Sequence, residues 1–273
     1  MGRKPLVSIV TTCFNAEKTI ERAIKSVIDQ YYNNIEYIII DACSTDGTKK
    51  IIQKYKNHIN YFISEKDNGI SDGWNKGIER CKGEFIQILN SDDYIPKNKI
   101  IESINCFNKN SNASYVFGDL IMVNDNSDPL YRIKGDENYS REIEYWTPRI
   151  NHPTLMVKKA IYDKYGHFNK KYKIAMDYEW LLRIHKQGAI GYYSEKIISF
   201  MQEGGQSEKL ISAINEEYNI AVKYGKPKII IISIQIIRYI KTNVRKLIET
   251  LFHFKYKKLY RNGIEEIDRN III

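Results

Sequence analysis

The stretch Gly83–Tyr94 reads Gly-Glu-Phe-Ile-Gln-Ile-Leu-Asn-Ser-Asp-Asp-Tyr, and it decides the class of fold that we expect. Its apolar part, residues 85–89, is short and is bounded by a glycine and by polar residues. Such a run is typical of a strand buried on both faces of a parallel sheet. Ligands of open α/β sheets bind beyond the carboxyl ends of the strands. The polar residues 90–93, which follow this strand directly, are therefore candidate ligand-binding residues.

Two adjacent carboxylates, Asp92 and Asp93, stand at the end of this predicted strand. They would repel each other unless a cation or a donor-rich ligand lay between them. Hard divalent cations such as Mg²⁺ and Mn²⁺ prefer oxygen ligands, and substrate phosphates usually complete their coordination. The alternative is an Asx-rich turn with no ligand, and these residues alone leave both interpretations open.

The sequence before this stretch alternates apolar runs with helical periodicity. We expect Asn15 to be the N-cap of the first helix, whose apolar residues recur at helical spacing from residue 20 to 31. Strands that alternate with helices predict right-handed crossovers and a parallel sheet, typical of a nucleotide-binding α/β fold. The predicted strands are residues 6–12, 36–41, 61–64 and 85–89, and the further predicted helices are 49–55 and 70–81.

The second half of the chain is less regular. We see no internal repeat and no low-complexity linker before residue 223. The predicted helices are residues 100–107, 159–165 and 176–187, and the predicted strands are 115–119, 120–123, 152–157, 188–193 and 197–200.

Composition predicts a globular protein in a reducing compartment. The 273 residues are enough for one large α/β domain with an appendage, and 12% aromatic residues allow a real core. The four cysteines form no CxxC pair, so we expect neither disulfides nor a zinc site, and a cytoplasmic location. The N-terminus lacks the apolar run of a signal peptide.

The positive charge is concentrated near the C-terminus. Residues 223–261 hold eleven Lys or Arg against one Glu, a net +10, so the rest of the chain sums to −1 within the total of +9. We therefore divide the chain into a body, residues 1–222, and a basic tail, residues 223–273. No nucleic-acid recognition motif accompanies this charge, so we expect no nucleic-acid partner.

The tail carries an apolar run, residues 229–240, that is too short to span a bilayer. On a helix, Arg238, Lys241 and Arg245 share one face. Such a pattern suits a helix lying on an anionic membrane surface, and the alternative is a helix packed on the body with a solvated basic face. The predicted apolar face consists of Ile230, Ile234, Ile237, Val244, Ile248 and Leu251.

Carboxylates follow three of the predicted strands: Asp41, Asp67 and the Asp92–Asp93 pair. A structural protein has no reason to line one edge of a sheet with acids. A site for a nucleotide sugar does, because a uracil ring, ribose hydroxyls and a metal-bound diphosphate all suit carboxylate partners. No GxGxxG motif and no GxxxxGK[ST] motif is present, which disfavours dinucleotide oxidoreductases and P-loop NTPases.

Four motifs in a fixed order, across residues 6–95, resemble the inverting family 2 glycosyltransferases with a GT-A fold. They are Val-Ser-Ile-Val-Thr-Thr-Cys-Phe-Asn (7–15), Asp-Ala-Cys-Ser-Thr-Asp-Gly-Thr (41–48), Ser-Glu-Lys-Asp-Asn-Gly-Ile-Ser-Asp-Gly-Trp-Asn-Lys-Gly (64–77) and Asn-Ser-Asp-Asp (90–93). The resemblance continues more loosely through His152-Pro153, residues 176–183 and Gly204-Gly205-Gln206-Ser207, to about residue 210.

The resemblance implies a role for each matching residue in transfer from a UDP-sugar. Asp177 would be the general base, Asp92 and Asp93 would hold Mn²⁺ or Mg²⁺, and Asp41 would accept from the uracil imide or the ribose. His152 and the Gly204–Ser207 loop would close over the diphosphate and the acceptor. The remaining expected donor-site residues are Thr11, Phe14, Asn15, Asp67, Asn75, Lys76 and Ser91.

The implied enzyme transfers a hexosyl or N-acetylhexosaminyl group to a glycan or polyprenyl-linked acceptor in bacterial surface polysaccharide synthesis, on the inner face of the membrane. Asn90 departs from the family, because many relatives have there the first Asp of a DXD triplet. That departure supports the alternative of a catalytically silent GT-A module. A nucleotidyltransferase is disfavoured because residues 11–15 contain no glycine. Without the resemblance, Asp177 would be a helix N-terminal acid and His152 a core histidine.

Overall fold

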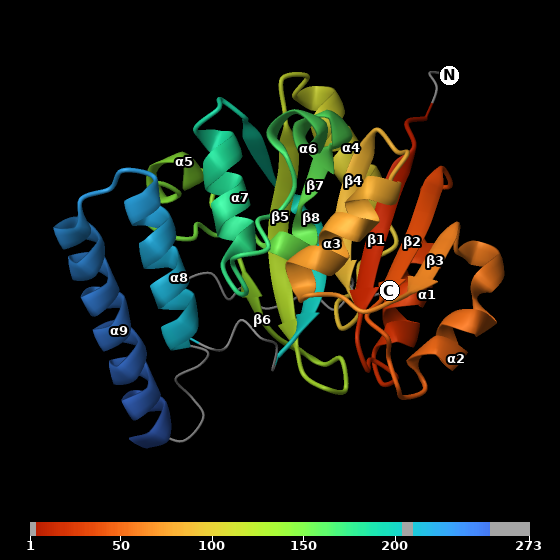
Figure 1. The fold of residues 1–273 in the computed structure, drawn as a ribbon, viewed down its shortest axis with the longest axis horizontal. Helices are drawn as coiled ribbons and strands as arrows, with labels where there is room; N and C mark the ends of the chain where they lie inside the picture. The colour runs from red at the N-terminus through yellow and green to blue at the C-terminus, as the bar shows by residue number, and fades with distance from the viewer. Residues whose placement is uncertain (1–3, 204–209, 252–273) are drawn as a thin grey trace.

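The computed structural model describes residues 4–203 and 210–251, which form an α/β fold with one central mixed sheet (Figure 1). Its strand order is β3-β2-β1-β4-β7-β5-β6, and β8 pairs with β5 beside this path. The strands are β1 (Val7–Cys13), β2 (Ile35–Asp41), β3 (Tyr61–Ser64), β4 (Phe85–Asn90), β5 (Tyr115–Val123), β6 (Pro129–Ile133), β7 (Met156–Lys158) and β8 (Gly191–Gln202).

Helices cover both faces of this sheet. The α-helices are α1 (Ile20–Ile28), α2 (Thr48–Lys54), α3 (Ile70–Arg80), α4 (Lys99–Lys109), α5 (Tyr139–Glu142), α6 (Lys159–Tyr165), α7 (Met176–His185), α8 (Leu210–Lys223) and α9 (Lys228–Leu251), and the 3₁₀ turns are η1 (Lys56–His58) and η2 (His152–Thr154).

The first four strands confirm the predicted parallel arrangement, since β1 pairs in parallel with β2 and β4, and β2 with β3. Side chains of β1 alternate between two cores: Val10 packs with the cluster beneath α3 and α7, and Ile9 with the cluster beneath α1 and α4. This two-sided burial is why these strands are apolar along nearly their whole length.

The second half corrects several predicted elements. Residues 115–123 form one strand, β5, and residues 191–202 form one strand, β8. The polar residues 194–196 of β8 lie where the register with β5 shifts, and they do not end the strand. The predicted strand 152–157 divides into η2 and the short β7, since Pro153 lies in a 3₁₀ turn. Strand β6 was not predicted. Both β6 and β7 are antiparallel to β5, so the sheet is mixed.

Helix α3 lies unusually close to β1. A Cβ on Gly77 would stand 2.2 Å from Cγ1 of Val10, and one on Gly73 would stand 3.2 Å from Cγ2 of Thr12. The two glycines are one helical turn apart, so they present a smooth surface to the strand. This close approach places the start of α3, just after Asp67, against the carboxyl end of β1.

The C-terminal helices α8 and α9 pack together at one end of the molecule, beyond α7 (Figure 1). The structure modifies the predicted basic face of α9. Arg238 contacts Glu217 of α8 instead of solvent, while Ile230 and Ile237 of the predicted apolar face are 41% and 52% exposed. The ion pair turns the basic side chain inward, and the isoleucines then face outward. In the described part of the chain, no helix is both long enough and apolar enough to cross a bilayer.

Candidate active site

The carboxyl ends of β1, β2 and β4 bring most of the predicted site residues to one edge of the sheet. The strand register pairs Cys13 with Asp41, and Thr12 with Asn90. At the same edge, Asp41 pairs with Ser64, from which the chain runs on to Asp67. The sequence-based prediction that these residues gather at one edge is therefore confirmed by the topology.

The Asp92–Asp93 pair is partly enclosed. Asp93 is 1% exposed, and its Oδ1 atom has no hydrogen-bond partner. Burial raises the pKa of Asp92, and burial together with the charge of Asp92 raises the pKa of Asp93 well above its usual value. An unpartnered buried carboxylate oxygen costs free energy, so this pair is poised to accept a cation.

A chain of contacts gives Asn90 a defined role beside this pair. Asn90 Nδ2 donates to Asp93 Oδ2 at 3.2 Å, while Asn90 Oδ1 accepts from Trp74 Nε1 at 3.2 Å. An aspartate at position 90 would lose the donor and add a second negative charge beside buried Asp93. The amide therefore satisfies both neighbours, which accounts physically for the departure from the DXD pattern.

His152 lies in contact with this chain. Its ring stacks on Trp74 with 4.2 Å between centroids and 5° between planes. Burial lowers the pKa of His152 to about 4, so the imidazole is neutral at neutral pH. Trp74 itself is 4% exposed and packs in the core, as expected for a packing residue. Through Trp74, His152 is connected to Asn90 and the carboxylate pair.

Arg22 of α1 is a site residue that the sequence did not reveal. Its guanidinium donates to the Asp92 carbonyl at 2.9 Å, to Gln202 Oε1 at 2.8 Å and to Ser127 Oγ at 2.5 Å. It also stacks 4.6 Å from the ring centre of Tyr94. Its hydrogen-bond partners are 70, 105 and 180 residues away in sequence, so no local pattern pointed to this residue.

A divalent cation fits the chemistry of the Asp92–Asp93 pair. The unpartnered Asp93 Oδ1 and the half-buried Asp92 supply adjacent anionic oxygens. Within residues 4–203 and 210–251, no three His, Cys, Asp or Glu side chains gather to hold a metal alone. A metal on two carboxylates would take its remaining ligands from a diphosphate and water, as Mg²⁺ commonly does.

Asp41 is enclosed more fully than a ligand-binding carboxylate would be. The residue is 0% exposed, and its oxygens accept from Ser44 N, Ser44 Oγ and, at 2.5 Å, Ser64 Oγ. To accept from a uracil or a ribose, Asp41 would have to give up one of these donors. In the structure it holds the 41–48 turn to the end of β3.

The expected nucleoside residues of the first motif divide into two groups. Thr11 is 0% exposed and its hydroxyl accepts from Tyr37 OH at 3.1 Å, so its predicted place at the nucleoside was wrong. Strand side chains alternate between faces, and Thr12 therefore points to the side of α3. Phe14 is 62% exposed and remains available to a base.

Asn15 is not the predicted N-cap, because the N-cap of α1 is Thr19, four residues further on. Asn15 instead has a left-handed backbone with φ of 48°, and its Oδ1 accepts from Thr45 N at 2.9 Å. The side chain is exposed at the end of β1, beside Phe14. Its predicted contact with the nucleoside stays a prediction.

Two of the expected residues of the third motif, Asn75 and Lys76, already have partners within the protein. Asn75 is turned away from the site, because its amide makes paired hydrogen bonds with the backbone N and O of Phe168 at 3.0 and 2.9 Å. The predicted role of Asn75 at the ribose was therefore wrong. Lys76 binds Glu65 at 2.8 Å and the Lys66 carbonyl at 2.7 Å, so its charge is already paired.

Asp67 and Ser91 keep positions that suit ligand binding. Asp67 is half-buried just beyond β3, and its Oδ1 accepts from Gly69 N at 3.0 Å. Ser91 is half-buried between Asn90 and Asp92. The Gly204–Ser207 loop lies outside the described residues.

Asp177 stands in the first turn of α7 and is half-buried. Its Oδ1 accepts from Tyr178 N at 2.8 Å. Burial raises the pKa of Asp177 to about 6, and the carboxylates of Glu217 and Glu216 add to the shift. The segment before α7 contacts the start of α3, because Ser71 Oγ donates to the Tyr172 carbonyl at 3.2 Å. The helix that carries Asp177 thus borders the same edge of the sheet.

The fold is that of the GT-A class of glycosyltransferases, and carboxylates line the ends of its parallel strands. Residues 8–171 match the family described as glycosyl transferase family 2. The chain therefore belongs to glycosyl transferase family 2 and is a glycosyltransferase. Asp177 lies beyond the matched residues, so the family match does not cover it.

Relatives from bacteria support this assignment. An uncharacterized glycosyltransferase of Rickettsia typhi is 30% identical over 221 residues, which cover 78% of this chain and 69% of the relative. A putative teichuronic acid biosynthesis glycosyltransferase, TuaG of Bacillus subtilis, is 37% identical over 125 residues, which cover 45% of this chain and 50% of TuaG.

Solved structures agree in fold. TarS 1-349 of S. aureus, in complex with UDP-GlcNAc, has a TM-score of 0.62 at 19% identity, covering 79% of this chain and 64% of TarS 1-349. The mannosyltransferase PcManGT of Pyrobaculum calidifontis, in complex with GDP-Man and Mn²⁺, has a TM-score of 0.61 at 16% identity, covering 82% of this chain and 66% of PcManGT. This chain spans less than two thirds of either solved chain.

Proposed function

We propose that this glycosyltransferase moves a hexosyl or N-acetylhexosaminyl group from a UDP-sugar to an acceptor hydroxyl, with inversion at the anomeric carbon. The observation that carries the proposal is that a candidate cation site and a candidate general base lie at the same edge of the sheet. The Asp92–Asp93 pair offers a cation site for a diphosphate. Asp177 offers a carboxylate whose pKa of about 6 suits a general base near neutral pH.

The donor site in this proposal combines the exposed ring of Phe14 with the carboxylate pair. Phe14 would stack on the uracil, and Asp67 and Ser91 would border the ribose and phosphates. Asp92 and Asp93 would hold Mn²⁺ or Mg²⁺, which as a Lewis acid would stabilise the departing diphosphate. The UDP-GlcNAc bound to TarS and the Mn²⁺ bound to PcManGT support this choice of donor and metal.

Asp177 would remove the proton from the attacking acceptor hydroxyl. Because burial keeps its pKa near 6, the carboxylate is ionised at pH 7 but is more basic than an exposed aspartate. Activity should therefore fall as the pH drops through about 6. His152, neutral and fixed on Trp74, would help to close the site over the diphosphate.

Asp177→Asn is the direct test of the base. We expect turnover to fall by about 10²- to 10⁴-fold, since general base catalysis is typically worth that much. UDP binding should stay unchanged, because Asp177 is assigned to the acceptor side. Asp163→Asn, at an exposed aspartate on α6, is the matched control. Near-normal turnover of Asp177→Asn would show that the base assignment is wrong.

We propose that the acceptor is a growing glycan or a polyprenyl-linked sugar in bacterial surface polysaccharide synthesis. The name of TuaG, a putative teichuronic acid enzyme, supports this setting. The body, residues 1–222, would carry catalysis, and the basic tail, residues 223–273, would attach to the anionic inner face of the cell membrane.

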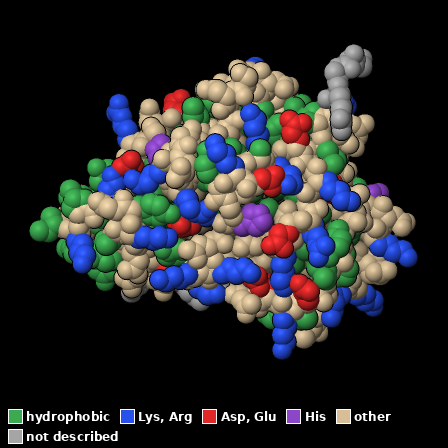
Figure 2. Space-filling view, turned by 45° about the horizontal axis from the view of Figure 1, so that its top comes forward, with side chains coloured by type: hydrophobic (Ala, Val, Ile, Leu, Met, Phe, Trp, Pro, Cys, Tyr) green, Lys and Arg blue, Asp and Glu red, His purple; other side chains and the backbone are tan. Residues whose placement is uncertain are grey.

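The described part of α9 supports the membrane proposal in a revised form. Its outward side is apolar and Figure 2 shows hydrophobic side chains gathered at that end of the molecule. Ile229 is 79% exposed, and Ile236 and Ile240 are 53% and 55% exposed. An apolar helix face flanked by basic residues binds at a lipid headgroup boundary.

A vesicle flotation assay tests the proposed attachment. The full chain should float with vesicles that contain anionic lipid, and Ile236→Asp with Ile240→Asp should abolish flotation. Phe62→Asp changes another exposed apolar residue, 38% exposed on β3, and should have no effect. Equal flotation of all three proteins would refute the role of α9.

The silent-module alternative is separated from the enzyme by ligand binding and turnover. A ligand that binds the native state raises the unfolding midpoint by mass action. We expect UDP to raise it, and Mn²⁺ to increase the shift. A protein that shows neither a shift with any nucleotide nor UDP release from any UDP-sugar would support the silent module.

A further inference from the structure

The start of α7 lacks a cap of its own. The N-cap residue is Ala175, whose methyl side chain cannot accept a hydrogen bond, and in the first turn Asp177 Oδ1 accepts from Tyr178 N. The first amide groups of a helix have no intrahelical partner. Since Asp177 follows Ala175 by two residues, whatever holds the backbone at this end also determines where Asp177 lies.

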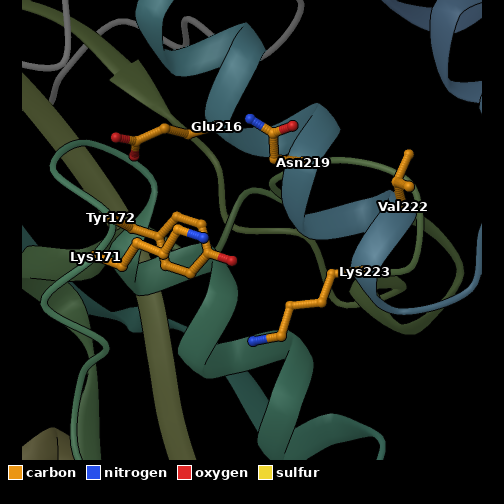
Figure 3. A pocket seen from close by; sticks show the side chains of 6 residues that line it. All are labelled: Lys171, Tyr172, Glu216, Asn219, Val222 and Lys223. Atoms are coloured by element: carbon orange, nitrogen blue, oxygen red, sulfur yellow. The ribbon is translucent and has the colours of Figure 1, made fainter.

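Glu216 of α8 holds the backbone that leads into α7, up to the N-cap residue Ala175. Its Oε2 accepts from Ile174 N at 2.9 Å and from Ala175 N at 2.8 Å, and its Oε1 accepts from Lys173 N at 2.9 Å. Figure 3 shows the Glu216 side chain extending from α8 away from Lys223. One carboxylate thus fixes three successive backbone amides.

Contacts on two sides hold helix α8, so Glu216 projects from a fixed helix. The neighbouring Glu217 binds Arg238 of α9 and accepts from Thr147 Oγ1 at 2.6 Å. At the C-terminal end of α8, Tyr224 OH donates to Glu179 of α7 at 2.7 Å. Apart from Thr147, the residues of these contacts lie beyond residues 8–171, the part that matches the family.

We propose that Glu216 is a positioning residue for the general base: by binding the backbone amides of residues 173–175, it fixes the start of α7 and places the Asp177 carboxylate for proton removal from the acceptor. This inference rests on the proposed function, in which Asp177 is the base. The charged groups that face Asp177 are Glu216 and Glu217, both on α8, and both raise the pKa of Asp177 beyond the effect of burial. Glu216 therefore acts on Asp177 through geometry and through charge.

Glu216→Gln separates this role from a purely structural one. Glutamine keeps the size of the side chain but loses the charge and one acceptor oxygen. We expect kcat to fall by about 10- to 100-fold, because small misplacements of catalytic groups have effects of this size. The KM for the donor should be unchanged. The pKa of Asp177, measured by NMR of the carboxyl carbon, should fall below its wild-type value.

Two further variants complete the experiment. Glu216→Asp restores the charge with a shorter reach, so it should return the pKa of Asp177 toward the wild-type value. Glu137→Gln removes an exposed carboxylate elsewhere and should change neither kcat nor that pKa. Wild-type kcat and an unchanged Asp177 pKa in Glu216→Gln would overturn the inference, as would equal losses of kcat and donor affinity.

A failure of the positioning role of Glu216 can be told apart from a failure of the proposed function. If Asp177→Asn is as active as the wild type, the base assignment fails whatever Glu216 does. If Asp177→Asn is inactive while Glu216→Gln is normal in kcat and in the Asp177 pKa, only the positioning role fails.

Discussion

Gly77→Ala should destabilise the protein, although alanine is a better helix former than glycine. Gly77 lies in the middle of α3, where the helix meets β1. A Cβ at this position would stand 2.2 Å from Cγ1 and 3.2 Å from Cγ2 of Val10. Non-bonded carbon atoms pack at about 3.5–4.0 Å, so either Val10 or the whole helix would have to move.

Val10 has little freedom to move. It is 0% exposed on the central strand β1, between β2 and β4, and its branched side chain is restricted at χ1. Inserting a methyl group into a well-packed core costs about 1–3 kcal/mol. The gain in helix propensity from glycine to alanine returns about 1 kcal/mol. Because the approach is so short, we take the upper part of the range and expect a net loss of about 2 kcal/mol.

Urea unfolding of four proteins measures this loss: the wild type, Gly77→Ala, Val10→Ala and the double variant. We expect Gly77→Ala to lower the midpoint with an unchanged m-value. In the Val10→Ala background the methyl group added at position 77 would have room while the gain in helix propensity stays, so the substitution should cost about 3 kcal/mol less there than in the wild type. UDP binding should also weaken in Gly77→Ala, because α3 carries Trp74, the partner of Asn90.

Two results would refute this explanation of the glycine. One is a Gly77→Ala protein as stable as the wild type. The other is an equal cost of the substitution with and without Val10, which would mean that the contact with β1 is not the cause.

Two further predictions concern the cationic side chains of Lys99 and Arg22. Lys99 is 0% exposed, and its ammonium group donates to Gln87. Burial lowers the pKa of Lys99 well below the unfolded value of about 10.4. Below a pH of about 10.4 the folded state therefore binds fewer protons than the unfolded state, and the free energy of unfolding rises with pH. Lys99→Met should flatten this rise when unfolding free energy is measured by urea between pH 6 and 9, and equal slopes would contradict it. Arg22→Gln should destabilise the protein by about 3 kcal/mol, since hydrogen bonds from charged groups are worth about 1.5–3 kcal/mol each and are not additive. It should also weaken Mn²⁺-dependent UDP binding through the Asp92 backbone, whereas Lys25→Gln on the same helix, 59% exposed, should do neither.

The parallel half of the sheet could be predicted because its signals are local. Short apolar runs bounded by polar residues gave β1 to β4 within one or two residues, and their order along the chain requires crossovers of one hand. Helix α1 followed in the same way, since Ile20, Ala23, Ile24 and Val27 recur at helical spacing and are all buried. Strand β8, which pairs in parallel with β5, was harder, because its polar residues lie at a shift of register and do not end the strand.

The candidate site was predictable only where its residues are neighbours in sequence. Asp92 and Asp93 are adjacent, so their mutual repulsion and their place at a strand end could be inferred directly. The faces of strand residues were less certain: a shift of one residue separates buried Thr11 from Thr12. Whether a polar residue of a motif already has a partner could not be inferred, as Asn75 with Phe168 shows.

The sequence by itself determined the family, the parallel sheet and the carboxylate pair at its edge, because these depend on local periodicity and on residues close together in the chain. Only the tertiary structure decided which polar groups are already paired and which are left for a ligand. It joined Arg22 to Gln202 across 180 residues, and Glu216 to Ala175 across 41. The physical reason is that hydrogen bonds are formed between neighbours in space, and the packing of the whole sheet and its helices determines those neighbours.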